Sequence, residues 1–180
     1  MSDTVAAPSP AVPHDLPPEL GADLGWLLGQ TFHGFLTLCQ QVSSDFPAGL
    51  RGLHVLRAAA GQARNQLEIA NLLSIDRSVM VRIIDELERS GLVVRCPDPA
   101  DRRARLLAPT DVGRERLIET DEQIARIEAQ LLAPLADGGS ALTTALQQVV
   151  AALHSTDADF GAACKALDPY AGGVASDPTC

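Results

Sequence analysis

Four arginines lie within eleven residues of this 180-residue chain, between Arg95 and Arg105, beside a turn that contains two prolines. Arginine carries a planar fork of donors that matches the oxygens of a phosphate and the edge of a guanine. The whole chain is acidic, with a formal net charge of −9. A basic cluster in an acidic chain indicates an anionic partner, although a run of charge is more often only a solvated surface.

Other groupings that could do chemistry are absent from the sequence. The four histidines stand far apart, at positions 14, 33, 54 and 154, and the four cysteines form no C-x-x-C pair. The sequence contains no glycine-rich phosphate loop and no recognisable nucleophile with its base. We therefore expect no enzyme, no metal site and no cofactor, and four free thiols in a reducing cytosol.

The residues before the arginine cluster predict two short helices joined by a turn. Asn65 and Glu68 have the spacing of a capping box, Asp76 can cap the second helix, and Gly91 suits a left-handed C-terminus. Helices separated by only Ser74–Asp76 are typical of a helix-turn-helix. The expected inward residues are Leu67, Ile69, Ala70, Leu72 and Leu73 on the first helix and Met80, Ile83, Ile84 and Leu87 on the second.

The cluster itself predicts a β-hairpin. Two apolar runs, Leu92–Cys96 and Arg103–Ala108, read as strands, and the segment between them holds Pro97 and Pro99. A hairpin directly after a helix-turn-helix is a wing, so the fold class is mostly α with a small β-hairpin wing.

Apolar residues at helical spacing predict helices on both sides of this lobe. The expected spans are a disordered Pro-rich arm over 1–18, a long helix from Leu20 to Ser43–Ser44, a short helix from Leu53 to Ala60, a long helix from Thr110 to 137–139, a last helix from Ala141 to Leu153, and a flexible tail over 157–180. No stretch has the length of a membrane span, and the N-terminus lacks the pattern of a signal peptide, so we expect a cytoplasmic protein without membrane contact.

The stretch from Gln66 to Leu117 resembles the MarR family of bacterial transcription regulators. The wing carries that family's pattern of Asp, one residue, Arg, and a Thr seven positions later, here Asp101, Arg103 and Thr110. Pro109 stands where the family usually has Leu, which is a departure from the pattern.

The resemblance implies one domain over 19–156 that forms a homodimer through 19–45 and 110–156. A winged lobe over 50–108 would then bind a double-stranded, palindromic DNA operator, as a ligand-responsive repressor does. The second helix of the lobe would enter the major groove and the wing would reach the minor groove. Carried onto this chain, the DNA-contacting residues are Arg77, Ser78, Val81, Arg82, Arg102, Arg103 and Arg105, with Asp101 supporting the wing.

Helical spacing supports this assignment independently, because Arg77, Val81 and Arg82 lie opposite the apolar face of their helix. Valine cannot hydrogen-bond a base but can touch a thymine methyl group. The alternative is that Arg82 only pairs with Glu86 four residues on.

The resemblance also implies a small aromatic or anionic effector, with Trp26, His33, His54 and Arg57 as candidate contacts. Some relatives sense oxidants through cysteine, for which Cys39 and Cys96 are the candidates here. A further alternative is a winged-helix dimer that serves as a protein-interaction module and binds no operator. The net charge of −9 favours that alternative, whereas the arginines at groove positions argue against it.

Overall fold

The two short helices predicted before the wing are present in the computed structural model, which describes residues 16–99 and 104–155. Helix α5 (Gln66–Leu72) begins with the expected capping box: the Asn65 side chain accepts from the Leu67 and Glu68 amides, and Glu68 accepts from the Asn65 amide at 2.8 Å. Helix α6 (Arg77–Arg89) is capped at its N-terminus by Asp76, whose carboxylate accepts a hydrogen bond from the Ser78 amide at 2.7 Å. The Ser78 hydroxyl, which also donates to this carboxylate, and secondarily the Ser78 amide hold the pKa of Asp76 below its usual value.

The Asn65→Ala variant should lower the free energy of unfolding by about 1 kcal/mol, because two amides at the start of α5 lose their acceptor. Chemical denaturation followed by circular dichroism measures the change. Asn65→Ser retains an oxygen at the cap and should recover most of the loss. Equal stability of the alanine variant and the wild type would contradict the capping role.

The apolar face of α6 is confirmed, and that of α5 is confirmed only in part. Met80, Ile83, Ile84 and Leu87 are buried. On α5 Ile69 and Ala70 are buried, but Leu67 and Leu72 are exposed, so the prediction that they face inward was wrong. At 100° per residue, five apolar positions within seven cannot share one side of a helix.

The described residues on either side of the wing tip form the two strands of the predicted hairpin. Strand β2 (Val93–Pro97) pairs antiparallel with β3 (Arg105–Pro109), in register from Val93 opposite Pro109 to Pro97 opposite Arg105. A third strand, β1 (Arg64–Asn65), pairs with the other edge of β3 and was not predicted, because two residues show no alternation. The sheet order is therefore β1-β3-β2.

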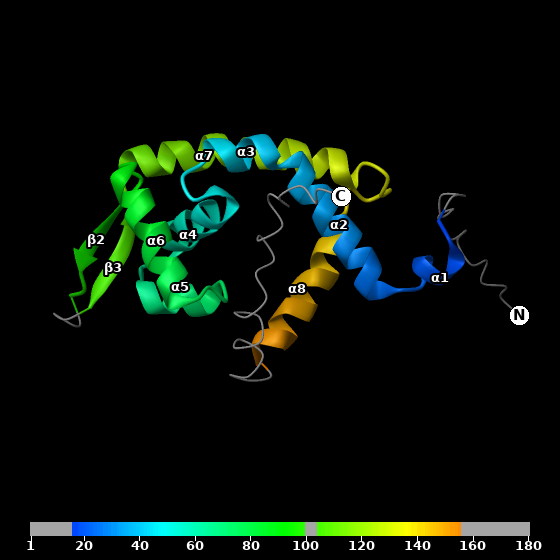
Figure 1. Cartoon of the computed structure of the whole chain (residues 1–180), viewed down its shortest axis with the longest axis horizontal. Coiled ribbons are helices and arrows are strands. Elements are labelled where there is room, and N and C mark those ends of the chain that lie inside the picture. The colour runs from blue at the N-terminus through cyan, green and yellow to red at the C-terminus, as the bar shows by residue number, and fades with distance from the viewer. Residues whose placement is uncertain (1–15, 100–103, 156–180) are drawn as a thin grey trace, which may run out of the picture. The chain divides into compact units, whose positions relative to one another are not determined.

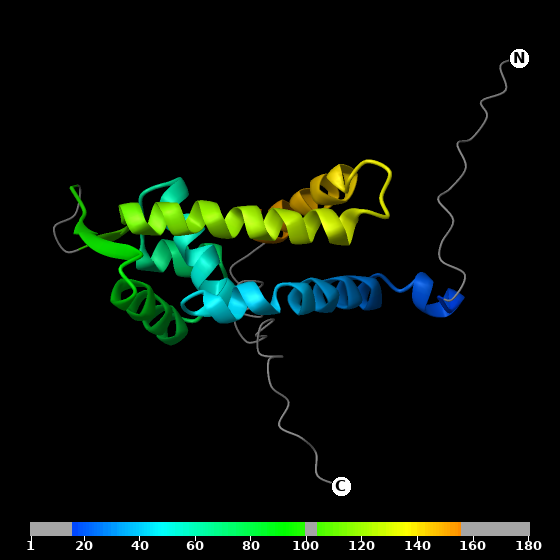
Figure 2. The ribbon, with the colours of Figure 1, turned by 90° about the horizontal axis from the view of Figure 1, so that it is seen from above.

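Helix α7 (Asp111–Leu132) runs across the lobe (Figures 1 and 2). Its length corresponds to about 33 Å at 1.5 Å per residue. As predicted, Thr110 caps it: the hydroxyl accepts from the Gly113 amide at 2.9 Å and donates to the Gly91 carbonyl at 2.6 Å. A Cβ on Gly113 would lie 2.0 Å from the Leu92 carbonyl oxygen, so only glycine fits where α7 meets the base of the wing.

Two further helices contact α7. Helix α3 (Gln40–Asp45) ends where the Arg116 guanidinium of α7 stacks over the Phe46 ring, 5.8 Å from its centroid. Helix α4 (Gly49–Gly61) is longer than the predicted Leu53–Ala60, and its Arg57 forms a 2.6 Å ion pair with Asp121 of α7. The buried core of this part of the chain includes Leu53, Leu56, Ile69, Met80, Ile84, Leu87, Val93 and Leu107.

The single long helix predicted from Leu20 to Ser43–Ser44 is wrong. The chain forms α1 (Pro18–Gly21), α2 (Leu24–Leu38) and α3 instead. A new helix begins after Asp23, because the Asp23 carboxylate accepts a hydrogen bond from the Trp26 amide at 2.9 Å and so caps the N-terminus of α2. The contacts divide the chain into two units, residues 1–37 and 38–180.

The last described helix, α8 (Ser140–Ser155), follows a turn at Asp137, whose carboxylate accepts from the Gly139 and Ala141 amides. Every side chain described on α8 is exposed, including an apolar set made of Leu142, Leu146, Val149, Val150 and Leu153. Among the described helices, none combines the length and the apolar character needed to cross a bilayer.

Candidate nucleic-acid interface

Helix α6 presents the four expected groove residues on its exposed side. Arg77, Ser78 and Arg82 are exposed, and Val81 is 41% exposed. The opposite side of the helix is fully buried at Met80, Ile84 and Leu87. The Ser78 hydroxyl also donates to the Asp76 carboxylate at 2.6 Å, so this side chain belongs to the helix cap as well as to the exposed face.

The alternative partner of Arg82 is engaged elsewhere. The Glu86 carboxylate accepts a 2.8 Å hydrogen bond from the amide of Ala48, a residue in the left-handed region with φ 57°. In the part of the chain that the structure describes, no ion pair joins Arg82 to Glu86. Glu86 therefore ties α6 to the turn between α3 and α4 and leaves the Arg82 guanidinium on the surface.

Of the three wing arginines predicted to contact DNA, the structure describes Arg105. Arg105 begins β3 and is exposed. Asp101, Arg102 and Arg103 lie outside the described residues, so their roles at the wing tip stay predictions. The described part of the hairpin closes with a hydrogen bond from the Asp98 amide to the Ala104 carbonyl at 3.3 Å.

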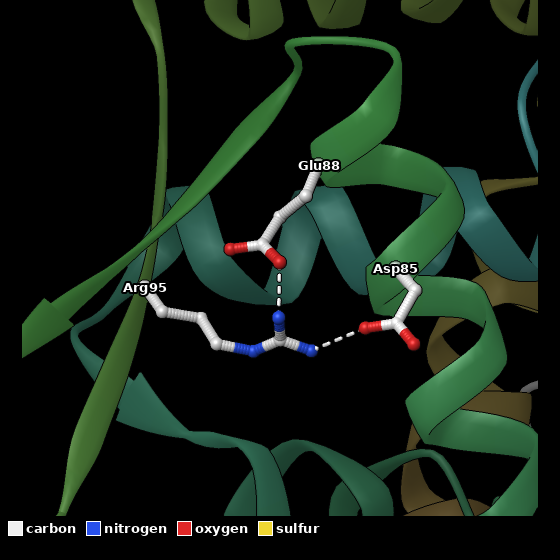
Figure 3. A network of polar contacts seen from close by, with 3 residues as sticks. All are labelled: Asp85, Glu88 and Arg95. Carbon is white, nitrogen blue, oxygen red and sulfur yellow. Dashed lines mark hydrogen bonds and ion pairs between the residues drawn. The ribbon is translucent and has the colours of Figure 1, made fainter.

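Arg95 has a role that the sequence reasoning missed. Its guanidinium reaches from β2 to α6, where Nη1 donates to Glu88 and Nη2 donates to Asp85 at 2.8 Å (Figure 3). The sequence held a signal for it, because Asp85 and Glu88 are three residues apart on a helix that is followed directly by the strand of Arg95. We call these three residues the Arg95 clamp.

The four candidate effector residues fall into two pairs. Trp26 and His33 lie on α2 within residues 1–37, half-buried and exposed respectively. His54 and Arg57 lie on α4, both half-buried. Burial, and secondarily the charge of Arg57, lower the pKa of His54, so this imidazole is neutral at pH 7. The pair on α4 therefore offers one cation, Arg57, and that cation already faces Asp121.

A separate hollow of about 340 Å³ lies behind the wing and contains none of those four residues. Its walls come from the end of α4, from both wing strands and from the start of α7. They are mostly small or apolar, and Arg114 is their one charged residue; the lining comprises Ala59, Ala60, Ala63, Cys96, Leu106, Leu107, Ala108, Pro109 and Arg114. Within residues 16–99 and 104–155, no three His, Cys, Asp or Glu side chains gather closely enough to hold a metal ion.

The two candidate redox cysteines differ in environment. Cys39 is completely buried, and burial together with the charge of Glu128 raises the pKa of its thiol. Cys96 is half-buried on β2. A buried thiol with a raised pKa reacts slowly, because the thiolate is the nucleophile. The environment of Cys39 therefore disfavours it as a sensor.

In the folded protein at pH 7.5, N-ethylmaleimide should modify Cys96 at least about tenfold faster than Cys39, because Cys39 is buried and its raised pKa lowers the fraction of thiolate. Peptide mass spectrometry after timed quenching measures both rates in one sample. The two rates should converge in denaturant. Equal rates in the native protein would show that the burial of Cys39 is not maintained in solution.

Three comparisons with known proteins agree with this architecture. The MarR family model matches residues 50–104, the part of the chain from α4 to the wing. A curated protein of Thauera aromatica, described as a transcriptional regulatory protein for the hcr operon, is 33% identical over 90 residues. That match covers 49% of this chain and 53% of the relative, so the chain spans about half the length of this curated relative.

Solved structures extend the similarity over most of the chain. A transcriptional repressor called CouR, bound to a 23-mer DNA duplex, is 35% identical, with 74% of this chain and 96% of that chain covered and a TM-score of 0.60. CouR from Rhodococcus jostii RHA1, bound to p-coumaroyl-CoA, is 25% identical, with 78% and 98% covered and a TM-score of 0.62. The helical fold, the small antiparallel sheet and these similarities show that the chain belongs to the MarR family of winged-helix transcriptional regulators.

Proposed function

We propose that this chain binds a specific palindromic operator as a homodimer, with α6 in the major groove and the wing in the adjacent minor groove. One observation carries the proposal: Arg77, Val81 and Arg82 lie exposed on one side of α6, opposite a side that is completely buried. The buried side fixes the orientation of the helix, so the arginines have a defined direction. The similar repressor solved on a DNA duplex supports this choice of partner.

The chemistry of the exposed side matches the major groove. Arginine can donate two hydrogen bonds to a guanine, and the Val81 side chain can contact a thymine methyl group. Arg102, Arg103 and Arg105 are the proposed wing contacts, because arginine suits the narrow, electronegative minor groove of A·T-rich DNA. Asp101 is the proposed support of the wing turn.

The dimer is proposed from the apolar surface outside the winged lobe. Leu142, Leu146 and Val149 recur at helical spacing on α8, and each is more than a third exposed. On α2, Leu24 and Leu28 are likewise exposed. An exposed apolar stripe of this kind marks a protein interface. We assign dimerisation to 19–45 and 110–156 and DNA binding to 50–108, within one domain over 19–156.

Repression relieved by a small molecule is the proposed mode of regulation. One similar protein is a repressor solved on DNA and another is solved with p-coumaroyl-CoA. For this chain, a small aromatic or anionic effector is proposed, with Trp26, His33, His54 and Arg57 as the candidate contacts. The alternative is regulation by oxidation of Cys39 or Cys96, and the burial of Cys39 disfavours that residue as the sensor.

The rival function is a winged-helix dimer that binds only proteins. The acidic net charge of −9 favours it, because whole-chain repulsion opposes binding to a polyanion. Against it stand the exposed Arg77 and Arg82, which no described ion pair engages.

Selection from a random-sequence library of DNA duplexes decides between the two functions. The full-length wild-type protein should enrich one inverted repeat whose half-sites are about 10 base pairs apart, centre to centre, as two lobes on one side of the helix require. A library that remains random after repeated rounds at low salt would overturn operator binding and leave the interaction module.

A further inference from the structure

We propose that the Arg95 clamp positions the wing relative to α6, so that both elements engage one DNA duplex together. The inference rests on the proposed function, because it assigns a task to residues between the two DNA-contacting elements. Arg95 itself lies on the wing, and Asp85 and Glu88 lie on α6 (Figure 3). One guanidinium thus bridges two carboxylates of a neighbouring element.

The clamp acts midway along β2. At the base of the wing, the Leu92 carbonyl accepts from the Thr110 amide at 3.0 Å. Three residues further on, the two contacts of Arg95 hold the strand against α6. The strand then continues through Pro97 toward the wing tip. A change in the separation of β2 and α6 would therefore move the described end of the strand at Pro97.

The same contacts add little to folding stability. The side chains of Arg95, Asp85 and Glu88 are 33%, 49% and 29% exposed. Ion pairs at such a surface typically contribute little to the free energy of unfolding, because water screens them. Their proposed effect is on geometry, since the flat guanidinium donates hydrogen bonds in only a few directions.

The charges on α6 make this role testable. Helix α6 carries three arginines and three acidic residues, and Asp85 lies one turn after Val81 on the groove side. A carboxylate beside DNA repels phosphates, so removing it should tighten binding if charge alone matters. If Asp85 and Glu88 instead hold the wing, removing both should weaken binding. The two explanations predict opposite signs.

The test compares four variants on the duplex that the wild-type protein selects. Arg95→Gln should weaken binding about three- to tenfold, and the double variant Asp85→Ala/Glu88→Ala should weaken it by a similar factor. The triple variant should be no weaker than either, because each change breaks the same clamp. Arg95→Lys keeps the charge but not the two-pronged geometry, so it should also bind more weakly than the wild type.

Hydroxyl-radical footprinting supplies a measurement that a loss of stability would not change. In the clamp variants, protection by α6 should remain while protection by the wing weakens. Melting temperatures should stay within about 3 °C of the wild type, as expected for a surface pair. The matched control is Asp157→Ala/Asp159→Ala, which removes two carboxylates outside the segments assigned to dimerisation and DNA binding and should not weaken binding.

An Asp85→Ala/Glu88→Ala variant that binds as tightly as the wild type, or more tightly, with the wing footprint intact would overturn the clamp and leave operator binding in place. A wild-type protein that selects no DNA would overturn the proposed function, and the clamp proposal would fall with it.

Discussion

Gly113→Ala should lower the free energy of unfolding by about 3 kcal/mol or more. The added Cβ would lie 2.0 Å from the carbonyl oxygen of Leu92, and the neighbouring atoms are backbone rather than a movable side chain. The Gly113 amide is also held by the Thr110 hydroxyl, so α7 cannot shift away without losing its cap.

Urea denaturation followed by circular dichroism, at one fixed protein concentration, measures this change. The matched control is Gly61→Ala at the end of α4, where a Cβ meets no atom within 4 Å. That variant should be unchanged or more stable by up to about 1 kcal/mol, since alanine is the better helix former. A Gly113→Ala protein with the wild-type midpoint would show that α7 does not approach the wing as closely as described.

The largest effect on DNA binding is expected from Arg77→Ala/Arg82→Ala. Each arginine that contacts DNA contributes about 1–3 kcal/mol, so the double variant should lose at least about thirtyfold in affinity for the selected operator. Both side chains lie on the surface of α6, so the fold should tolerate their removal. Fluorescence anisotropy with labelled operator measures the loss.

The matched control, Lys165→Ala, removes one positive charge outside the segments assigned to dimerisation and DNA binding and should change affinity by less than about threefold. Random DNA distinguishes the kind of contact: a loss confined to the operator marks contacts to bases, whereas an equal loss on both marks contacts to phosphates. Wild-type affinity of the double variant would remove α6 from the interface.

Three helix starts could be predicted because each is encoded within four residues. Asn65, Asp76 and Thr110 are capping residues in the structure as they are in the sequence pattern. The buried side of α6 was predictable for a similar reason, since Met80, Ile84 and Leu87 recur at helical spacing.

The features that were missed depend on contacts between distant segments or on competing local ones. Strand β1 pairs with a segment more than 40 residues away and is too short to show a pattern. Arg95 appeared as one member of a basic cluster, because only the folded hairpin brings its guanidinium to Asp85 and Glu88. The break before α2 comes from the Asp23 cap, which competes with an apolar periodicity that continues through it.

The proposed function depends on specific binding by two copies of the chain. The most direct measurement is analytical ultracentrifugation of the wild-type protein with the selected duplex and with a shuffled duplex, at physiological salt. The account predicts two chains on each selected duplex and binding at least about a thousandfold tighter than to the shuffled one. Equal affinity for both duplexes, or no binding to either, would contradict it.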